Sequence, residues 1–173
     1  MPLNDGACNH LIGKLLPDID LLSTQQTIIN LSTIKGWSVI YCYPMTGQPN
    51  VALPDGWDGI PGARGCTPQS CGFRDNFQAI LDLKAQVYGL STQSSEYQQE
   101  AATRLHLPFP LLSDAHLVFT RSLNLPIFEV NQMQLNKRVT LITYDGVIQH
   151  YFYPVFPPDK NVNVVIDWLK LNV

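Results

Sequence analysis

Residues 37–75 read WSVIYCYPMTGQPNVALPDGWDGIPGARGCTPQSCGFRD, and this stretch decides the fold. Its first part, Trp37–Tyr43, is rich in β-branched and aromatic residues, which favours a strand. From Pro44 to Gly65 the chain is full of Pro, Gly and Asp without a periodic pattern, so we expect a long loop. Loops of that length in compact domains are often functional. A helix should follow, because Pro68 suits a first helical turn. The apolar face expected for that helix consists of Phe73, Phe77, Ile80 and Leu81.

Strands and helices continue on either side of this stretch. Further strands are expected at Thr27–Leu31 and Val87–Leu90. Helices are expected at Ser94–Leu105, at Asp114–Leu123 and from about Asp159. The last of these helices should face the core with Val162, Val165, Ile166 and Leu169. Val139–Tyr144 and Val147–Tyr153 flank Asp145-Gly146, the strongest hairpin signal in the chain. Crossover helices require parallel strands, whereas a hairpin supplies an antiparallel pair. We therefore predict the α/β class, with a mixed β-sheet covered by helices on both faces, which is the layout of a thioredoxin-like fold.

The composition narrows the class of protein. The chain has 173 residues, of which 45% are hydrophobic and 14% charged, so we expect one folded domain over residues 1–173. A net charge of −3 and a pI near 5.7 argue against nucleic-acid binding, which usually shows a basic excess. The sequence has no run of about 18 apolar residues, so it predicts no membrane span. The first residues lack the basic and apolar stretches of a secretory signal, so a cytoplasmic, reducing location is the expectation.

The four cysteines stand in unequal surroundings, and a reducing location argues against a structural disulfide framework. Cys42 alternates within a predicted strand and should be buried and inert. Cys66 falls at the start of the predicted helix, where unpaired N–H groups and the helix dipole favour the reactive thiolate. Cys71 follows on the same helix. Cys8 and His10 could nominally join this pair as zinc ligands, but the spacing matches no standard finger, so we expect no metal.

The segment around the cysteine pair is similar to that of a known family. Its sequence is Gly65-Cys66-Thr67-Pro68-Gln69-Ser70-Cys71-Gly72-Phe73-Arg74-Asp75. It closely resembles the active-site segment of the peroxiredoxin Q, or bacterioferritin-comigratory, branch of the peroxiredoxins. Other stretches agree in order: Tyr43-Pro44, Gly89-Leu90-Ser91-Thr92, Pro108-Phe109-Pro110-Leu111-Leu112-Ser113-Asp114 and Arg138-Val139-Thr140-Leu141-Ile142. The resemblance covers nearly the whole chain, and together these motifs are specific.

This resemblance implies a thiol peroxidase that reduces hydrogen peroxide and organic hydroperoxides without a metal, flavin or haem. Cys66 would be the peroxidatic cysteine and Cys71 the resolving one, closing an intramolecular disulfide that a thioredoxin- or glutaredoxin-type donor reduces. The family has an arginine just before the late strand, and Arg138 matches it. A guanidinium offers several fixed donors and keeps its proton, so Arg138 is the candidate for stabilising charge along the O–O bond. The expected assembly is a monomer or a weak homodimer.

One departure from the family pattern concerns the residues before Cys66. The family places a proline seven residues and a threonine or serine three residues before the peroxidatic cysteine, where this chain has Gly59 and Ala63. The simplest account is an inserted loop at about residues 45–62, which makes Pro44 the equivalent of the family proline. Thr46 would then supply the missing hydroxyl. We accordingly expect Pro44 and Thr46 to take part in substrate binding.

Two other functions share these features. A thiol–disulfide oxidoreductase of thioredoxin type would normally show Cys-x-x-Cys, whereas four residues separate Cys66 from Cys71. A redox sensor or binding protein would use the same disulfide as a switch, because sensors and peroxidases share reactive thiolates. Stoichiometric oxidation without turnover would favour the sensor.

Overall fold

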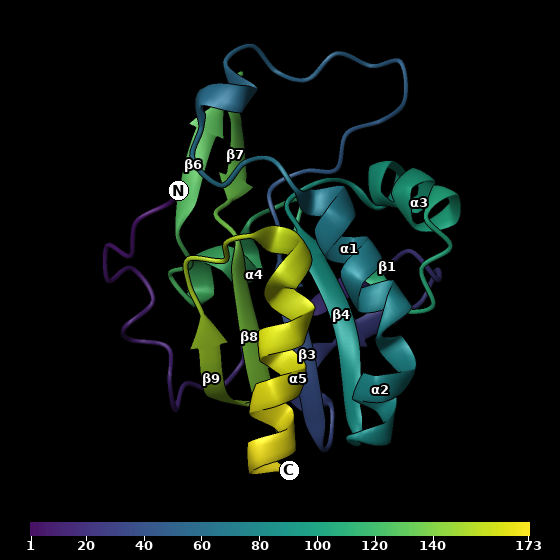
Figure 1. The fold of residues 1–173 in the computed structure, drawn as a ribbon, viewed down its shortest axis with the longest axis vertical. Helices are drawn as coiled ribbons and strands as arrows, with labels where there is room; N and C mark the ends of the chain where they lie inside the picture. Colours follow the sequence, from purple (N-terminus) through teal and green to yellow (C-terminus); the bar gives the residue numbers. More distant parts are fainter.

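A seven-stranded mixed sheet forms the centre of the computed structural model, which describes residues 1–173 (Figure 1). Its strands are β1 (Asp20–Ser23), β2 (Ile28–Asn30), β3 (Trp37–Cys42), β4 (Ala85–Ser91), β5 (Leu111–Ser113), β8 (Val139–Tyr144) and β9 (Val147–Phe152). They lie side by side in the order β2-β1-β5-β4-β3-β8-β9. The β3–β4 and β4–β5 pairs are parallel, and β8 pairs antiparallel with both β3 and β9. The predicted mixed sheet and the hairpin at Asp145-Gly146 are therefore confirmed.

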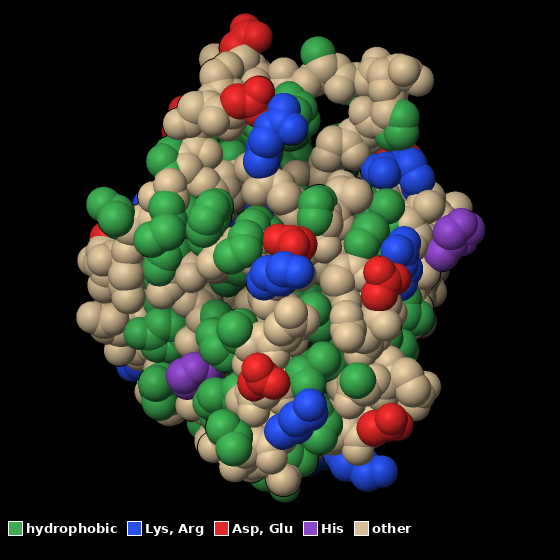
Figure 2. Space-filling model, in the orientation of Figure 1, with side chains coloured by type: hydrophobic (Ala, Val, Ile, Leu, Met, Phe, Trp, Pro, Cys, Tyr) green, Lys and Arg blue, Asp and Glu red, His purple; other side chains and the backbone are tan.

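Helices cover both faces of this sheet (Figure 1). One face carries α1 (Cys66–Asp75), α2 (Phe77–Asp82) and α5 (Asn161–Asn172), the opposite face carries α4 (Val118–Ser122), and α3 (Ser95–Arg104) packs beside β5. Short 3₁₀ helices occur at η1 (Leu31–Thr33), η2 (Trp57–Gly59) and η3 (Pro158–Lys160). On the face that α1 and α5 cover, acidic and basic side chains are interspersed rather than gathered by sign (Figure 2). No helix is long and apolar enough to cross a membrane.

The core lies in two layers because alternate residues of a strand point to opposite faces. Val39 and Tyr41 of β3 pack with Phe73 beneath α1 and α5, whereas Ile40 and Cys42 pack with Phe119 of α4. The residues expected on the core face of the last helix are all buried: Val162, Val165, Ile166 and Leu169. The connection from β3 to α1 contains only η2 as regular structure, which confirms the predicted long loop.

Several predicted helices differ from those observed. The helix expected to run through Phe77 and Leu81 is broken at Asn76, whose side chain donates to the carbonyl of Gly72 at 2.9 Å, and Leu81 is only half-buried. The helix expected over Asp114–Leu123 is limited to α4. Asp114 remains outside it, because its carboxylate accepts hydrogen bonds from backbone amides at the start of that helix. The last helix begins two residues later than predicted, after η3.

Four strands were not predicted. β1 and β5 are short, and they pair with each other between β2 and β4. The other two, β6 (Ile127–Val130) and β7 (Met133–Asn136), form a separate two-stranded arm. Its turn is Asn131-Gln132, and both residues have positive φ angles. Turns of this kind usually contain glycine, and this one does not, so the hairpin signal is weak.

Candidate active site

Cys66 is the first residue of α1, and its side chain is only 3% exposed. Gly65 precedes it with a φ of 108°, in the left-handed region that favours glycine. A Cβ at this position would come within 2.6 Å of the Pro158 side chain. The chain therefore enters α1 through a glycine packed against η3. This geometry places the sulfur at the helix N-terminus, as predicted, where free N–H groups and the helix dipole favour a thiolate.

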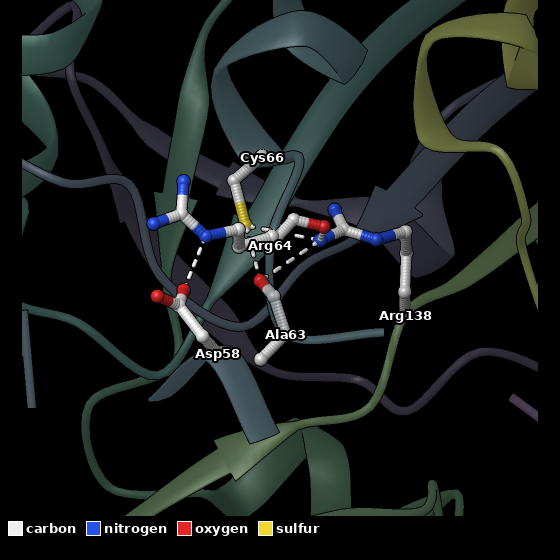
Figure 3. Close-up of polar contacts among 5 residues, drawn as sticks. All are labelled: Asp58, Ala63, Arg64, Cys66 and Arg138. Carbon is white, nitrogen blue, oxygen red and sulfur yellow. Dashed lines mark hydrogen bonds and ion pairs between the residues drawn. The ribbon is translucent and has the colours of Figure 1, made fainter. Parts of the chain in front are cut away.

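Arg138 lies beside this sulfur, just before β8 (Figure 3). Its Nη2 donates to Cys66 Sγ at 3.3 Å and also lies 3.1–3.3 Å from the carbonyl oxygens of Gly62, Ala63 and Arg64. The Cys66 thiol in turn contacts the Ala63 carbonyl at 3.8 Å. Arg138 is 4% exposed and forms no ion pair with a carboxylate. The guanidinium therefore contacts the Cys66 sulfur without competition from a carboxylate.

A buried chain of amide and hydroxyl groups fixes the other side of Arg138. Its Nη1 donates to Gln69 Oε1 at 2.5 Å, and Gln69 Nε2 donates to Asn161 Oδ1 at 3.0 Å. The Thr140 hydroxyl donates to the same Asn161 oxygen at 2.7 Å. The chain joins α1, β8 and α5, and it orients the guanidinium toward Cys66. Sequence reasoning did not single out these three polar residues, although Gln69 stands three positions after Cys66, which puts both on one helix face.

A cavity of about 360 Å³ adjoins Cys66. One side of it comes from the residues around the start of α1, including Ala63. The other side comes from the long connection, through the apolar side chains of Met45, Leu53 and Trp57. Arg64 and Thr67 also line it, so the cavity beside Cys66 has both apolar and polar walls.

Neither of the two predicted substrate-binding residues lines this cavity. Pro44 and Thr46 are buried beside it, while Met45 and Gly47 are part of its lining. The Thr46 carbonyl accepts a hydrogen bond from the Tyr97 hydroxyl at 2.8 Å. Its own hydroxyl is buried and has no hydrogen-bond partner. Thr46 thus has a free hydroxyl next to the cavity but does not contact the sulfur.

The remaining cysteines differ in exposure. Cys71 lies on α1 with Cys66 and is half-buried, and all four cysteines are free thiols. Cys42 is fully buried, as predicted, and so is Cys8, despite its polar sequence neighbours. Burial raises the pKa of Cys8 to about 12 and raises the pKa of Cys42 further. Both therefore remain protonated near neutral pH.

Charged side chains near the site are few. Arg64 follows Ala63 and is among the residues that line the cavity, while its exposed guanidinium pairs with Asp58 (Figure 3). This hydrogen bond lowers the pKa of Asp58. No group of three or more His, Cys, Asp or Glu side chains is placed to hold a metal ion.

Known proteins share both the sequence and the fold. Residues 11–166 match the Redoxin family. Chloroplastic peroxiredoxin Q from Sedum lineare is 27% identical over 159 residues, which cover 91% of this chain and 77% of that protein. Peroxiredoxin bcp1 from Schizosaccharomyces pombe is 36% identical over 106 residues, covering 60% of this chain and 46% of that protein. The chain spans 66% of the length of chloroplastic peroxiredoxin Q from rice.

The structural comparison concerns the fold alone. Peroxidoxin BcpB from Mycobacterium tuberculosis superposes with a TM-score of 0.75 at 23% identity. The match covers 95% of this chain and 99% of that one. The predicted thioredoxin-like fold is thereby confirmed.

Proposed function

The chain belongs to the Redoxin family, as a peroxiredoxin of the Q type, and we propose that it reduces hydroperoxides with Cys66 as the nucleophile. The observation that carries the proposal is the contact at 3.3 Å between Arg138 Nη2 and Cys66 Sγ at the start of α1. A buried guanidinium without a carboxylate partner can stabilise both the thiolate and the charge that develops on the departing oxygen. This arrangement supports peroxide chemistry rather than a structural role for the thiol.

In the first step the Cys66 thiolate attacks the terminal oxygen of the hydroperoxide. An S–O bond forms as the O–O bond breaks. The departing oxygen leaves as water or an alcohol after it takes up a proton, and Cys66 becomes a sulfenic acid.

Forming a thiolate does not by itself explain a fast first step. For thiols in general, lowering the pKa from about 8.5 to about 6 raises the thiolate fraction at pH 7 roughly 30-fold, while nucleophilicity falls about tenfold. Most of the acceleration must therefore come from groups that stabilise the transition state, and Arg138 is placed to do so.

In the second step the Cys71 thiol attacks the sulfenic acid, releases water and forms an intramolecular disulfide with Cys66. The position of both cysteines on α1 and the partial exposure of Cys71 support this assignment. A dithiol donor of thioredoxin or glutaredoxin type then reduces the disulfide by exchange. The cycle requires no metal, flavin or haem.

Thr46 provides the hydroxyl that the family has at the position of Ala63 and this chain lacks there, and Pro44 holds the start of the connection beside the site. The support for Thr46 is its buried hydroxyl without a partner, which is free to bond a peroxide oxygen. Thr46→Val should slow the oxidation of Cys66 and leave the condensation with Cys71 unchanged. An unaltered oxidation rate would exclude Thr46 from substrate binding.

The test of the proposal is steady-state peroxide consumption with thioredoxin or glutaredoxin as reductant. Cys66→Ser should abolish turnover, while Cys8→Ala, a change at a buried cysteine outside the site, should retain it. Full activity in Cys66→Ser would overturn the assignment. A single stoichiometric oxidation of the wild type without turnover would favour the redox sensor.

A further inference from the structure

A second cavity adjoins Arg138, and it shares no lining residue with the cavity beside Cys66. It holds about 370 Å³, and we call it the Arg138 cavity. Its walls come from the N-terminal segment, whose first residues lie beside β6 (Figure 1), and from the stretches just before β8 and just after β9. Gly62 lines the Arg138 cavity and Ala63 lines the other, so the chain at these two residues separates the two cavities.

The wall of the Arg138 cavity is mostly apolar. Phe128 and Ile60 line it, and both also pack against the apolar cluster that contains Trp57. Val155, which follows β9, lines it as well and is buried. Ligand pockets in proteins generally hold about 300–1,000 Å³ and combine apolar walls with a few polar groups. The Arg138 cavity therefore has the size and the lining to take a small molecule.

The charged side chains on this wall leave one positive charge in excess. Lys137 and Arg138 are cationic, and Asp5 is the single acidic residue of the lining. The Asp5 carboxylate already has partners, because it accepts hydrogen bonds from the Tyr153 hydroxyl at 3.0 Å and from the Ala7 amide at 3.1 Å. It also pairs with Lys137 at 3.6 Å. Arg138 pairs with no carboxylate, so an anionic group in the cavity would balance its charge.

One donor of Arg138 is left without a partner. Nη1 donates to Gln69 and Nη2 to Cys66, whereas Nε is buried and has no hydrogen-bond partner. Buried donors are nearly always satisfied, and a carboxylate oxygen is a strong acceptor for a guanidinium. Nε lies below the cavity surface, so a carboxylate reaches it only when the guanidinium shifts toward the cavity. That shift lengthens the contact at 3.3 Å between Nη2 and Cys66 Sγ.

We propose that the Arg138 cavity binds a small amphipathic carboxylate, and that this ligand slows peroxide reduction by drawing Arg138 away from Cys66. The apolar part of the ligand lies against Phe128 and Val155, and its carboxylate lies between Arg138 and Lys137. The regulatory half of this inference rests on the proposed peroxidase function, whereas the binding half does not.

Titration calorimetry on the reduced protein tests the site with octanoate, octanol and acetate. Octanoate has about ten non-hydrogen atoms, and a cavity of about 370 Å³ holds roughly twelve groups of the size of a water molecule. Octanoate should therefore bind. Octanol should bind about tenfold or more weakly, because it brings no charge to Arg138. Acetate should not bind measurably, because it lacks the apolar chain.

Two substitutions should change the affinity for octanoate in opposite directions. Lys137→Gln removes a cation from the wall and should weaken binding about threefold, the size of an exposed charge pair. Asp5→Asn removes the competing carboxylate and should strengthen binding by a similar factor. Lys35→Gln is the matched control for Lys137→Gln, because Lys35 is exposed and lies outside the cavity, so the affinity should not change. None of the three residues is buried, so each variant should fold.

Stopped-flow oxidation of Cys66 by hydrogen peroxide tests the regulatory half. The rate should fall about fivefold or more as octanoate saturates the site, the low end of typical coupling between two sites. The concentration for half the effect should match the calorimetric Kd and should shift with Lys137→Gln and Asp5→Asn. The residual rate of Arg138→Ala should not respond to octanoate.

Absence of octanoate binding, or equal affinity for octanol, would overturn the proposed site. Binding that neither Lys137→Gln nor Asp5→Asn alters would also overturn it, because octanoate would then lie elsewhere, for example beside Cys66. An unchanged oxidation rate with octanoate bound would overturn the regulation. Failure of the proposed function looks different. In that case the wild type without octanoate would consume no peroxide, or Cys66→Ser would consume it, while calorimetry would still report the site.

Discussion

Closing a disulfide between Cys66 and Cys71 should unwind α1. The helix runs without interruption from Cys66 to Asp75. Residues five apart on an α-helix are separated by about 7.5 Å of rise and about 140° of rotation, which puts their Cα atoms about 8–9 Å apart. A disulfide requires roughly 4.4–6.8 Å. The two Cα atoms must therefore approach by about 2 Å or more, and an intact helix does not allow this.

The unwinding breaks hydrogen bonds made by the residues that lie between the two cysteines on α1. The Gln69 amide donates to the Gly65 carbonyl at 3.0 Å, and the Gln69 side chain binds Asn161. The hydroxyls of Ser70 and Tyr41 are 3.0 Å apart. Each such hydrogen bond contributes about 1 kcal/mol net, so these three together add about 3 kcal/mol to the free energy needed to open this turn of α1. Releasing that protection should speed amide exchange in this turn by roughly 10²-fold.

Hydrogen exchange followed by mass spectrometry measures this change. Peptides covering residues 65–75 should exchange faster after oxidation by peroxide and recover after reduction. Cys71→Ser is the control, because it still oxidises at Cys66 but has no partner with which to close the ring, so α1 should stay protected. The reasoning is refuted if the wild type carries the disulfide by mass while its α1 amides remain as protected as in the reduced protein.

Three further predictions concern the site. Arg138→Ala removes the donor at 3.3 Å from Cys66 Sγ and should lower kcat/KM by about 10²–10³, as loss of one oxyanion donor does. If stopped-flow measurement shows that the rate of Cys66 oxidation falls less than tenfold, Arg138 does not stabilise the transition state. Gln69→Glu gives the guanidinium a competing carboxylate and draws it away from Cys66, which should slow the oxidation of Cys66 by about tenfold or more. An unchanged stopped-flow rate would leave Gln69 a purely structural role. Burial raises the pKa of Cys8 to about 12 and raises the pKa of Cys42 further. Iodoacetamide added to the native protein at pH 8 should therefore modify Cys66 before either of these two cysteines. Rapid labelling of Cys8 or Cys42, detected by peptide mapping, would contradict their burial.

The sequence predicts well those features that have a local signal. Pro68 marks the first turn of α1, and Asp145-Gly146 marks the β8–β9 hairpin. β1 and β5 have no comparable signal, because such short strands take their register from their neighbours, as in the pair of Leu22 with Ser113. The β6–β7 arm was missed because no glycine marks its turn.

The same distinction applies to the site. The position of Cys66 at a helix start follows from nearby residues. Arg138 stands 72 positions away and was found only through the family resemblance. The contact of Gln69 with Asn161 spans 92 positions, and nothing in the local pattern of either residue indicates it. Which polar side chains meet in a core depends on how the layers pack, and this is set by the whole fold.

The distance along the chain between Cys66 and its supporting residues also matters while the protein is being made. The ribosome adds about 5–20 residues per second, so the 92 residues from Gln69 to Asn161 take roughly 5–20 s to synthesise. During this interval the nascent chain already carries the Cys66 thiol. It at first lacks both Arg138 and Asn161, and after Arg138 is added it still lacks Asn161. Premature termination before Asn161 would release a polypeptide with the cysteine and without α5. Residues translated long after Cys66 therefore complete the surroundings of the nucleophile.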